Sequence, residues 1–123
     1  MILVDTSVWI DHLRRSDEVL VQLLATGQVL AHPFVIGELA LGNLHNRAVV
    51  LSALQDLPQA PVASNNEVLR FIDSNALFGI GIGYIDAHLL AAVRLLPGTM
   101  LWTRDKRLLA ASIRLGLAQK ASH

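Results

Sequence analysis

The stretch that decides the fold stands at the start of the chain: Ile2-Leu3-Val4-Asp5-Thr6-Ser7. Three consecutive apolar residues predict a short strand that is buried on both faces. The Asp, Thr and Ser that follow favour the start of a helix, because their side-chain oxygens accept hydrogen bonds from free helix N–H groups. A buried strand that passes directly into a helix is typical of a parallel sheet covered by helices.

The rest of the chain continues this alternation of strands and helices. Further strands are predicted at 28–32 and 99–103, with shorter ones at 60–63 and 117–119. Ser64 is followed three residues later by Glu67, which is the spacing of a capping box. Apolar periodicity and capping residues predict helices over 8–13, 17–27, 33–45, 46–57, 64–78, 84–96 and 105–116. We therefore expect one three-layer α/β/α domain over residues 1–123, with a mainly parallel central sheet flanked by helices.

The composition excludes several classes of protein. With 123 residues, 53% hydrophobic, and ten basic against ten acidic side chains, the chain is not disordered and is long enough to bury its own core. The absence of cysteine excludes a disulfide framework, a zinc finger and a thiol nucleophile, and it favours a reducing cytoplasm.

The mean hydropathy of +0.47 raises the question of a membrane segment. The longest uncharged stretches, such as 75–85, end well short of the roughly 20 apolar residues that a membrane span requires. The N-terminus reaches Asp5 without the basic region of a signal peptide. We therefore expect no membrane segment, and we assign the surplus of apolar surface to a homodimer interface.

Four acidic residues stand out in the sequence, and two of them stand where a parallel sheet places its ligands. Such sheets bind ligands at the carboxyl ends of their strands. Asp5 follows the strand at 2–4, and Asp105 follows the strand at 99–103, so both are expected at the same edge. Glu38 lies in a helix that is apolar on nearly every face and has no basic neighbour, which predicts a central helix with a buried carboxylate. Asp86 begins a helix after a glycine-rich approach.

Each of these acids also has a purely structural interpretation. Asp5 and Asp105 suit helix N-caps, Asp86 suits the positive end of a helix dipole, and Glu38 suits a solvent-facing position. Four converging carboxylates, in contrast, repel one another unless hard cations lie among them. Oxygen ligands of this kind favour Mg²⁺ or Mn²⁺ over zinc.

Four blocks of sequence together resemble a known family. They are Val4-Asp5-Thr6-Ser7-Val8-Trp9-Ile10-Asp11, the helix entry from Pro33 to Glu38, Tyr84-Ile85-Asp86-Ala87 and Trp102-Thr103-Arg104-Asp105. In this order and over essentially the whole chain, they resemble the PIN domain, and specifically the VapC-type toxins of bacterial type II toxin–antitoxin pairs. The resemblance implies a metal-dependent endoribonuclease that forms a homodimer and is inhibited by a VapB-type antitoxin.

The resemblance also implies roles for individual residues. The acidic positions that hold Mg²⁺, with Mn²⁺ as a substitute, correspond to Asp5, Glu38, Asp86 and Asp105. The small polar positions that support them correspond to Thr6, Ser7 and Thr103. Basic residues near these blocks are candidate RNA contacts or simply solvated helix faces: Arg104, Lys106, Arg107, Arg14 and Arg15. Arg104 is the first choice among them because it stands between Thr103 and Asp105.

Two other functions compete with the nuclease. Phosphoryl transfer to Asp5 requires a second acid near Asp5 and a lysine after a later strand. In this chain position 7 is Ser and the only lysines are Lys106 and Lys120, which disfavours that function. A non-catalytic PIN-like module that binds RNA or another protein stays open, because only an activity measurement excludes it.

Overall fold

The computed structural model describes residues 1–119, so the last four residues of the domain predicted over 1–123 lie outside the described residues. The strands in the described part are β1 (Ile2–Val4), β2 (Val29–Leu30) and β3 (Met100–Trp102). The helices in that part are α1 (Thr6–Arg14), α2 (Glu18–Ala25), α3 (Pro33–Ala40), α4 (Arg47–Asp56), α5 (Asn65–Ser74), α6 (Tyr84–Leu95) and α7 (Lys106–Arg114).

The three strands form a parallel sheet in the order β2-β1-β3. In its register Leu3 pairs with Leu30 on one side and with Leu101 on the other. Isolated bridges from Ala31 to Gln59 and from Leu101 to Ala118 extend the sheet at both edges. Because all three strands run the same way, the segments that follow them meet at one edge of the sheet.

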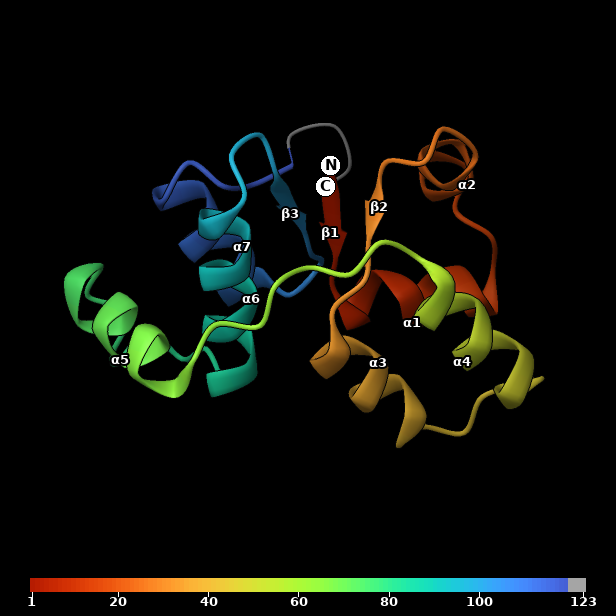
Figure 1. Cartoon of the computed structure of the whole chain (residues 1–123), viewed down its shortest axis with the longest axis horizontal. Coiled ribbons are helices and arrows are strands. Elements are labelled where there is room, and N and C mark those ends of the chain that lie inside the picture. Colours follow the sequence, from red (N-terminus) through yellow and green to blue (C-terminus); the bar gives the residue numbers. More distant parts are fainter. Residues whose placement is uncertain (120–123) are drawn as a thin grey trace.

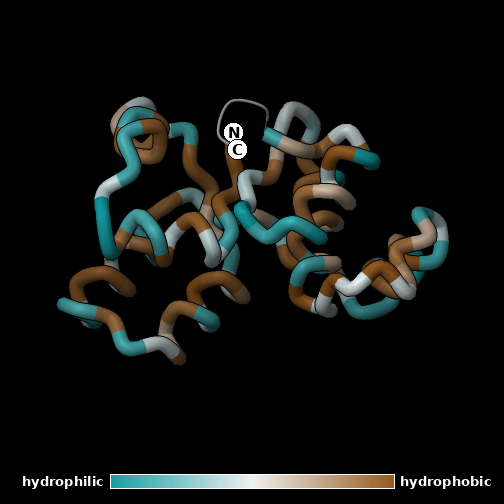
Figure 2. Tube along the Cα trace, turned by 180° about the vertical axis from the view of Figure 1, so that it is seen from behind, coloured by the Kyte–Doolittle hydropathy of each residue, from teal (hydrophilic) through white to brown (hydrophobic). Residues whose placement is uncertain are grey.

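Helices cover the sheet, which confirms the predicted three-layer α/β/α fold. Figure 1 shows α6 and α7 on the β3 side of the sheet, with α5 outside α6, and α1 to α4 on the other side. Hydrophobic residues run through the central strands in Figure 2, and Leu3, Val4 and Leu101 are fully buried there. Helix α6 supplies much of the remaining core, including Leu89 and Leu90. Among the described residues, no helix is long and apolar enough to cross a membrane.

Several predicted boundaries are wrong. The helix predicted over 33–45 ends at Ala40, and Leu41 after it is 90% exposed. The helix predicted over 64–78 ends at Ser74, because Asn75 caps it and Ala76 adopts a positive φ of 50°. The structure has no strand at 60–63, where the chain forms a single bridge one residue earlier at Gln59, and the strand predicted at 117–119 is a single bridge at Ala118. At each edge of the sheet the chain pairs with the neighbouring strand at one residue only, so no regular strand forms there.

Candidate metal centre

Asp5 lies at the end of β1 and is buried, with 6% of its surface exposed. Its Oδ2 accepts hydrogen bonds from Thr103 Oγ1 at 2.7 Å and from Ser7 Oγ at 2.8 Å. Although Asp5 occupies the N-cap position of α1, its side chain accepts no capping hydrogen bond. The interpretation of the Asp5 side chain as a helix cap is therefore wrong, and its carboxylate is bound by two hydroxyl groups instead.

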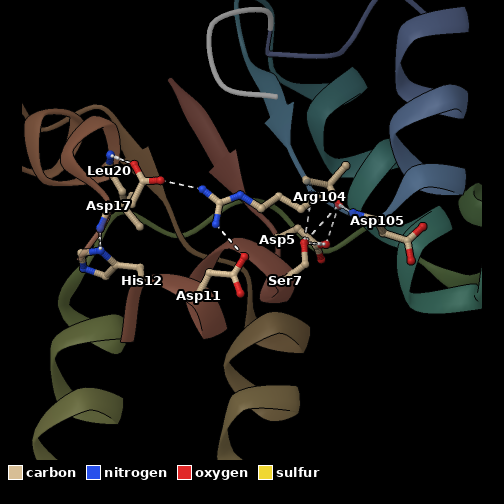
Figure 3. Close-up of polar contacts among 9 residues, drawn as sticks. Asp5, Ser7, Asp11, His12, Asp17, Leu20, Arg104 and Asp105 are labelled. Atoms are coloured by element: carbon tan, nitrogen blue, oxygen red, sulfur yellow. Dashed lines mark hydrogen bonds and ion pairs between the residues drawn. The ribbon is translucent and has the colours of Figure 1, made fainter. Parts of the chain in front are cut away.

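Asp105 follows β3 and does cap a helix. Its Oδ1 accepts from the backbone N–H of Arg107 at 3.0 Å and of Leu108 at 2.9 Å at the start of α7. Its own N–H donates to Thr103 Oγ1 at 3.1 Å. One hydroxyl, on Thr103, therefore contacts both Asp5 and the Asp105 backbone. Figure 3 shows the Asp105 carboxylate extending away from the Arg104 side chain.

Glu38 reaches the same edge from α3, but on an exposed face. The expectation of a central helix with a buried carboxylate is wrong, since Gly37, Glu38 and Leu41 are all exposed. The apolar composition of α3 indicates that part of the helix is buried, but it does not indicate which face is buried. Glu38 Oε1 accepts a hydrogen bond of 2.7 Å from Thr6 Oγ1 at the start of α1.

Asp86 lies in the first turn of α6 and is partly buried. Its Oδ2 accepts from the N–H of Gly83 at 3.0 Å. Burial raises the pKa of Asp86, and the charges of Asp5, Asp105 and Glu38 raise it further, against the opposing effect of the Gly83 hydrogen bond. The fold therefore brings the four acids within electrostatic reach of one another, as the sequence predicted.

The four carboxylates share one arrangement. Each accepts hydrogen bonds from the chain through one oxygen, while the described residues supply no partner to the other oxygen. Within residues 1–119, no group of three or more acidic or histidine side chains lies close enough together to hold a metal ion by itself. Mg²⁺ fits such a set, because it keeps several water ligands and binds proteins through one or two carboxylates rather than through a closed cage.

The hydroxyl residues named from the sequence lie against these acids. Thr6 contacts Glu38, whereas Ser7 and Thr103 contact Asp5. Ser7 Oγ also accepts from the N–H of Arg104 at 3.0 Å and lies 3.4 Å from Thr103 Oγ1. These contacts restrain the orientation of two carboxylates, those of Asp5 and Glu38.

The basic candidates separate into two kinds. Arg104 is occupied, because it forms ion pairs with Asp11 at 2.7 Å and with Asp17 at 2.5 Å, and its guanidinium lies 5.7 Å from the Trp102 ring centroid. Arg107 has no acidic partner among the described residues and lies against the backbone of Gly81, in the loop before Asp86. The remaining candidates are exposed on the surface: Lys106, Arg14 and Arg15.

The sequence did not identify the partners of Arg104. Asp11 lies on α1, and Asp17 is the N-cap of α2, where its side chain accepts a hydrogen bond from the Leu20 N–H. Both lie more than 80 positions before Arg104, at separations of 93 and 87 residues. No local sequence signal links residues that far apart, so this contact is visible only in the structure (Figure 3).

His88, two positions after Asp86, is part of an aromatic cluster instead of the acidic site. Its ring packs edge-on against Phe34 at 4.8 Å and against Tyr84 at 4.7 Å between centroids. His32 joins the same cluster through Phe34. Both histidines are buried, and their packing agrees with a structural role.

Comparison with known proteins identifies the family. A family model described as "PIN domain" matches residues 2–113. Ribonuclease VapC32, from two strains of Mycobacterium tuberculosis, is 53% identical over 118 residues, which cover 96% of this chain and 95% of that protein. The crystal structure of PAE2754 from Pyrobaculum aerophilum has the same fold, with a TM-score of 0.61 and 19% identity over 96% of this chain and 87% of that one. The chain therefore belongs to the PIN-domain family and, within it, to the VapC proteins.

Proposed function

We propose that this protein is a Mg²⁺-dependent endoribonuclease, with Mn²⁺ as a substitute, that acts as the toxin of a type II toxin–antitoxin pair. The observation that carries the proposal is the set of four carboxylates, each hydrogen-bonded to the described residues through only one of its two oxygens. Its likeness to a protein named Ribonuclease VapC32 supports RNA as the substrate. One nuclease domain over residues 1–123 is part of the proposal.

The proposed roles follow from the contacts of each acid. Asp5, Asp86 and Asp105 would hold the divalent cation, directly or through its water ligands, and Glu38, which accepts a hydrogen bond from Thr6, would orient the attacking water. A bound divalent cation supplies a water of lowered pKa and offsets the charge that develops on the phosphoryl oxygens. Because water attacks and not the ribose 2′-hydroxyl, the products carry a 5′-phosphate and a 3′-hydroxyl.

Arg107 is the basic residue that we assign to the RNA backbone. It stands two residues after Asp105, beside the Gly81 backbone, and no carboxylate among the described residues pairs with it. Since the whole chain carries no net charge, only a few such cations attract the phosphates. RNA affinity should therefore be modest and should fall steeply with salt.

A VapB-type antitoxin is the partner that we propose for an apolar groove next to the acids. The groove has a volume of about 310 Å³ and contains Ile10, Leu13, Leu39 and Leu44, with Glu38 at its edge. A protein segment seated there would bury the apolar side chains and would also block access to Glu38. This arrangement explains how one partner can cover both an apolar surface and the active site.

The proposal also includes a homodimer in the cytoplasm. Large apolar side chains remain exposed on the isolated chain, including Val49 at 71% and Phe78 at 66%. Burial of such side chains in a second copy would remove them from water. Light scattering on the purified protein tests this part, and a monomeric mass at micromolar concentration would contradict it.

The direct test of the proposed function compares the wild type with Asp5→Asn. Each protein, freed of any co-purified partner by unfolding and refolding, is incubated with total cellular RNA in Mn²⁺, in Mg²⁺ and in EDTA. We expect discrete fragments from the wild type with either metal, and none with EDTA or with Asp5→Asn. Equal cleavage by Asp5→Asn would reveal a contaminating nuclease. A wild type that binds RNA and cuts none of it would instead support a non-catalytic binding module.

A further inference from the structure

Arg104 connects the loop after β3 to the opposite side of the acidic site. We propose that Arg104 is a positioning residue, which holds the Asp105 loop against α1 and so fixes the relative placement of Asp5 and Asp105, and that it is not an RNA ligand. The inference rests on the proposed function, because it concerns the same metal centre. It also replaces the expectation from the sequence that Arg104 is the first choice for an RNA contact.

The side chain of Arg104 forms two ion pairs within the protein. Its two terminal nitrogens contact different acids, Nη1 to Asp11 on α1 at 2.7 Å and Nη2 to Asp17 at the start of α2 at 2.5 Å. Asp17 is itself fixed, since its Oδ1 caps α2 and its N–H donates to His12 Nδ1 at 3.0 Å. The two ion pairs occupy both terminal nitrogens and direct the guanidinium toward α1 and α2, although 33% of the side chain is exposed.

The backbone of Arg104 is hydrogen-bonded to the same helix, α1, one turn before Asp11. Its N–H donates to Ser7 Oγ, and the same Oγ donates to Asp5 Oδ2. Ser7 and Asp11 are four residues apart, so they lie on one face of α1. The residue therefore contacts two successive turns of α1, through its main chain and through its side chain.

These two contacts act on two carboxylates at once. The Ser7 contact sets the orientation of Asp5, and the position of Arg104 sets where the next residue, Asp105, begins α7. Residues that support metal-binding carboxylates in this way typically change metal affinity or activity by about 10-fold or more when they are replaced. Loss of the Arg104 ion pairs should therefore weaken metal binding without any direct contact to the metal.

The test uses variants that break the ion pairs from either side. Arg104→Met removes the positive charge. Arg104→Lys keeps the charge but lacks the two terminal nitrogens that bind two acids. The double variant Asp11→Asn/Asp17→Asn keeps the arginine and removes the negative charge of both partners. Asn at position 17 still caps α2, because Asn and Asp are equivalent at N-caps. The matched control is Arg70→Met, an exposed arginine on α5. Circular dichroism and thermal unfolding verify that each variant is folded.

Two measurements separate the alternatives. The first is calorimetric titration of the RNA-free protein with Mn²⁺, and the second is the anisotropy of a fluorescein-labelled RNA oligonucleotide in EDTA. We expect Arg104→Met and the double Asn variant to weaken Mn²⁺ binding by about 10-fold, Arg104→Lys to fall in between, and RNA affinity to change by less than about twofold. Arg70→Met should match the wild type in both.

Other outcomes overturn the inference in recognisable ways. If Arg104 is an RNA ligand, Arg104→Met weakens RNA binding at unchanged Mn²⁺ affinity, and Asp11→Asn/Asp17→Asn tightens RNA binding because it frees the cation. If the wild type binds Mn²⁺ and cleaves RNA but Arg104→Met binds Mn²⁺ equally well, the positioning role alone fails. If the wild type binds no Mn²⁺ and cleaves nothing, the proposed function fails and the positioning role fails with it.

Discussion

Thr103 donates a hydrogen bond of 2.7 Å to Asp5 Oδ2 and thereby joins residues 98 positions apart in the chain. The contact exists because β1 and β3 are neighbouring parallel strands, with Val4 in register with Trp102, so the residues after each strand meet. The bond is buried, and it orients the Asp5 carboxylate by the fold alone. The orientation of Asp5 is thus set by hydrogen bonds within the fold.

Replacing Thr103 by Val should loosen Asp5 while preserving side-chain shape. Because the buried carboxylate loses a donor, we expect the free energy of unfolding to fall by about 1–3 kcal/mol and Mn²⁺ affinity to fall by about 10-fold. Urea unfolding in EDTA and calorimetric Mn²⁺ titration measure the two effects. Thr99→Val is the control, since Thr99 is also buried and has no contact with Asp5. Equal Mn²⁺ affinity for both variants would show that Thr103 does not orient the carboxylate.

Asp86 should destabilise the metal-free protein at neutral pH. Burial first, and then the other three carboxylates, raise the pKa of Asp86 above that of the unfolded chain. The protonated form is therefore favoured by folding, and its stabilising contribution is lost as pH rises through the folded pKa. In EDTA at pH 7.5, Asp86→Asn should melt a few degrees above the wild type, and this difference should vanish near pH 3.5, where Asp86 is protonated.

With Mn²⁺ bound, the wild type should melt above Asp86→Asn. Mn²⁺ stabilises the wild type by mass action and stabilises Asp86→Asn much less, because one ligand is missing. Melting temperatures with and without Mn²⁺ at pH 7.5 provide the comparison. A wild type that melts above Asp86→Asn in EDTA would contradict the electrostatic account of this residue.

Gly81 should matter for RNA binding through Arg107. Gly81 has a φ of +84°, and a Cβ there would lie 2.5 Å from Arg107 Nη1, so Gly81→Ala strains the loop and displaces the arginine. Gly79→Ala is the matched control, because Gly79 has a φ of +72° with open space around its Cβ position. Each variant should lose about 1 kcal/mol of stability. Only Gly81→Ala should weaken binding of labelled RNA in EDTA, and equal RNA affinity for the two would remove Arg107 from the proposed interface.

The buried histidines should make stability depend on pH. Burial, and then the nearby His88, lowers the pKa of His32 to about 4. The neutral form is favoured by folding, so its contribution is present above pH 6.5 and is lost as pH falls toward 4. For His32 alone this amounts to about 2 kcal/mol at pH 5. His32→Asn keeps an acceptor for the Phe34 N–H, which His32 Nδ1 now binds, and should flatten the pH dependence of urea unfolding between pH 7 and 5. A slope equal to that of the wild type would contradict this assignment.

Much of the fold was predictable because its signals are local. The apolar run at 2–4 gave a buried strand, and Ser64 with Glu67 formed the capping box that their spacing indicates. The convergence of Asp5 and Asp105 followed from parallel strands alone. These predictions succeeded because neighbouring residues determine caps and strand ends, and parallel topology then places those ends together.

The sequence-based predictions that failed concern contacts and burial that residues adjacent in the sequence do not determine. Glu38 lies on an exposed face of α3, since the chain's packing decides which side of an apolar helix is covered. Arg104 turned out to be paired with Asp11 and Asp17, two acids from a distant part of the sequence. Such contacts depend on tertiary placement, and no sequence pattern encoded them.

The chemistry of the cut ends tests the central claim most directly. RNA fragments made by the wild type in Mn²⁺ are mapped by ligation methods that distinguish a 5′-phosphate from a 5′-hydroxyl. Because water attacks at a carboxylate-held metal, we predict 5′-phosphate and 3′-hydroxyl ends, and no fragments from Asp5→Asn or in EDTA. Fragments with a 2′,3′-cyclic phosphate and a 5′-hydroxyl, formed equally well in EDTA, would contradict the account.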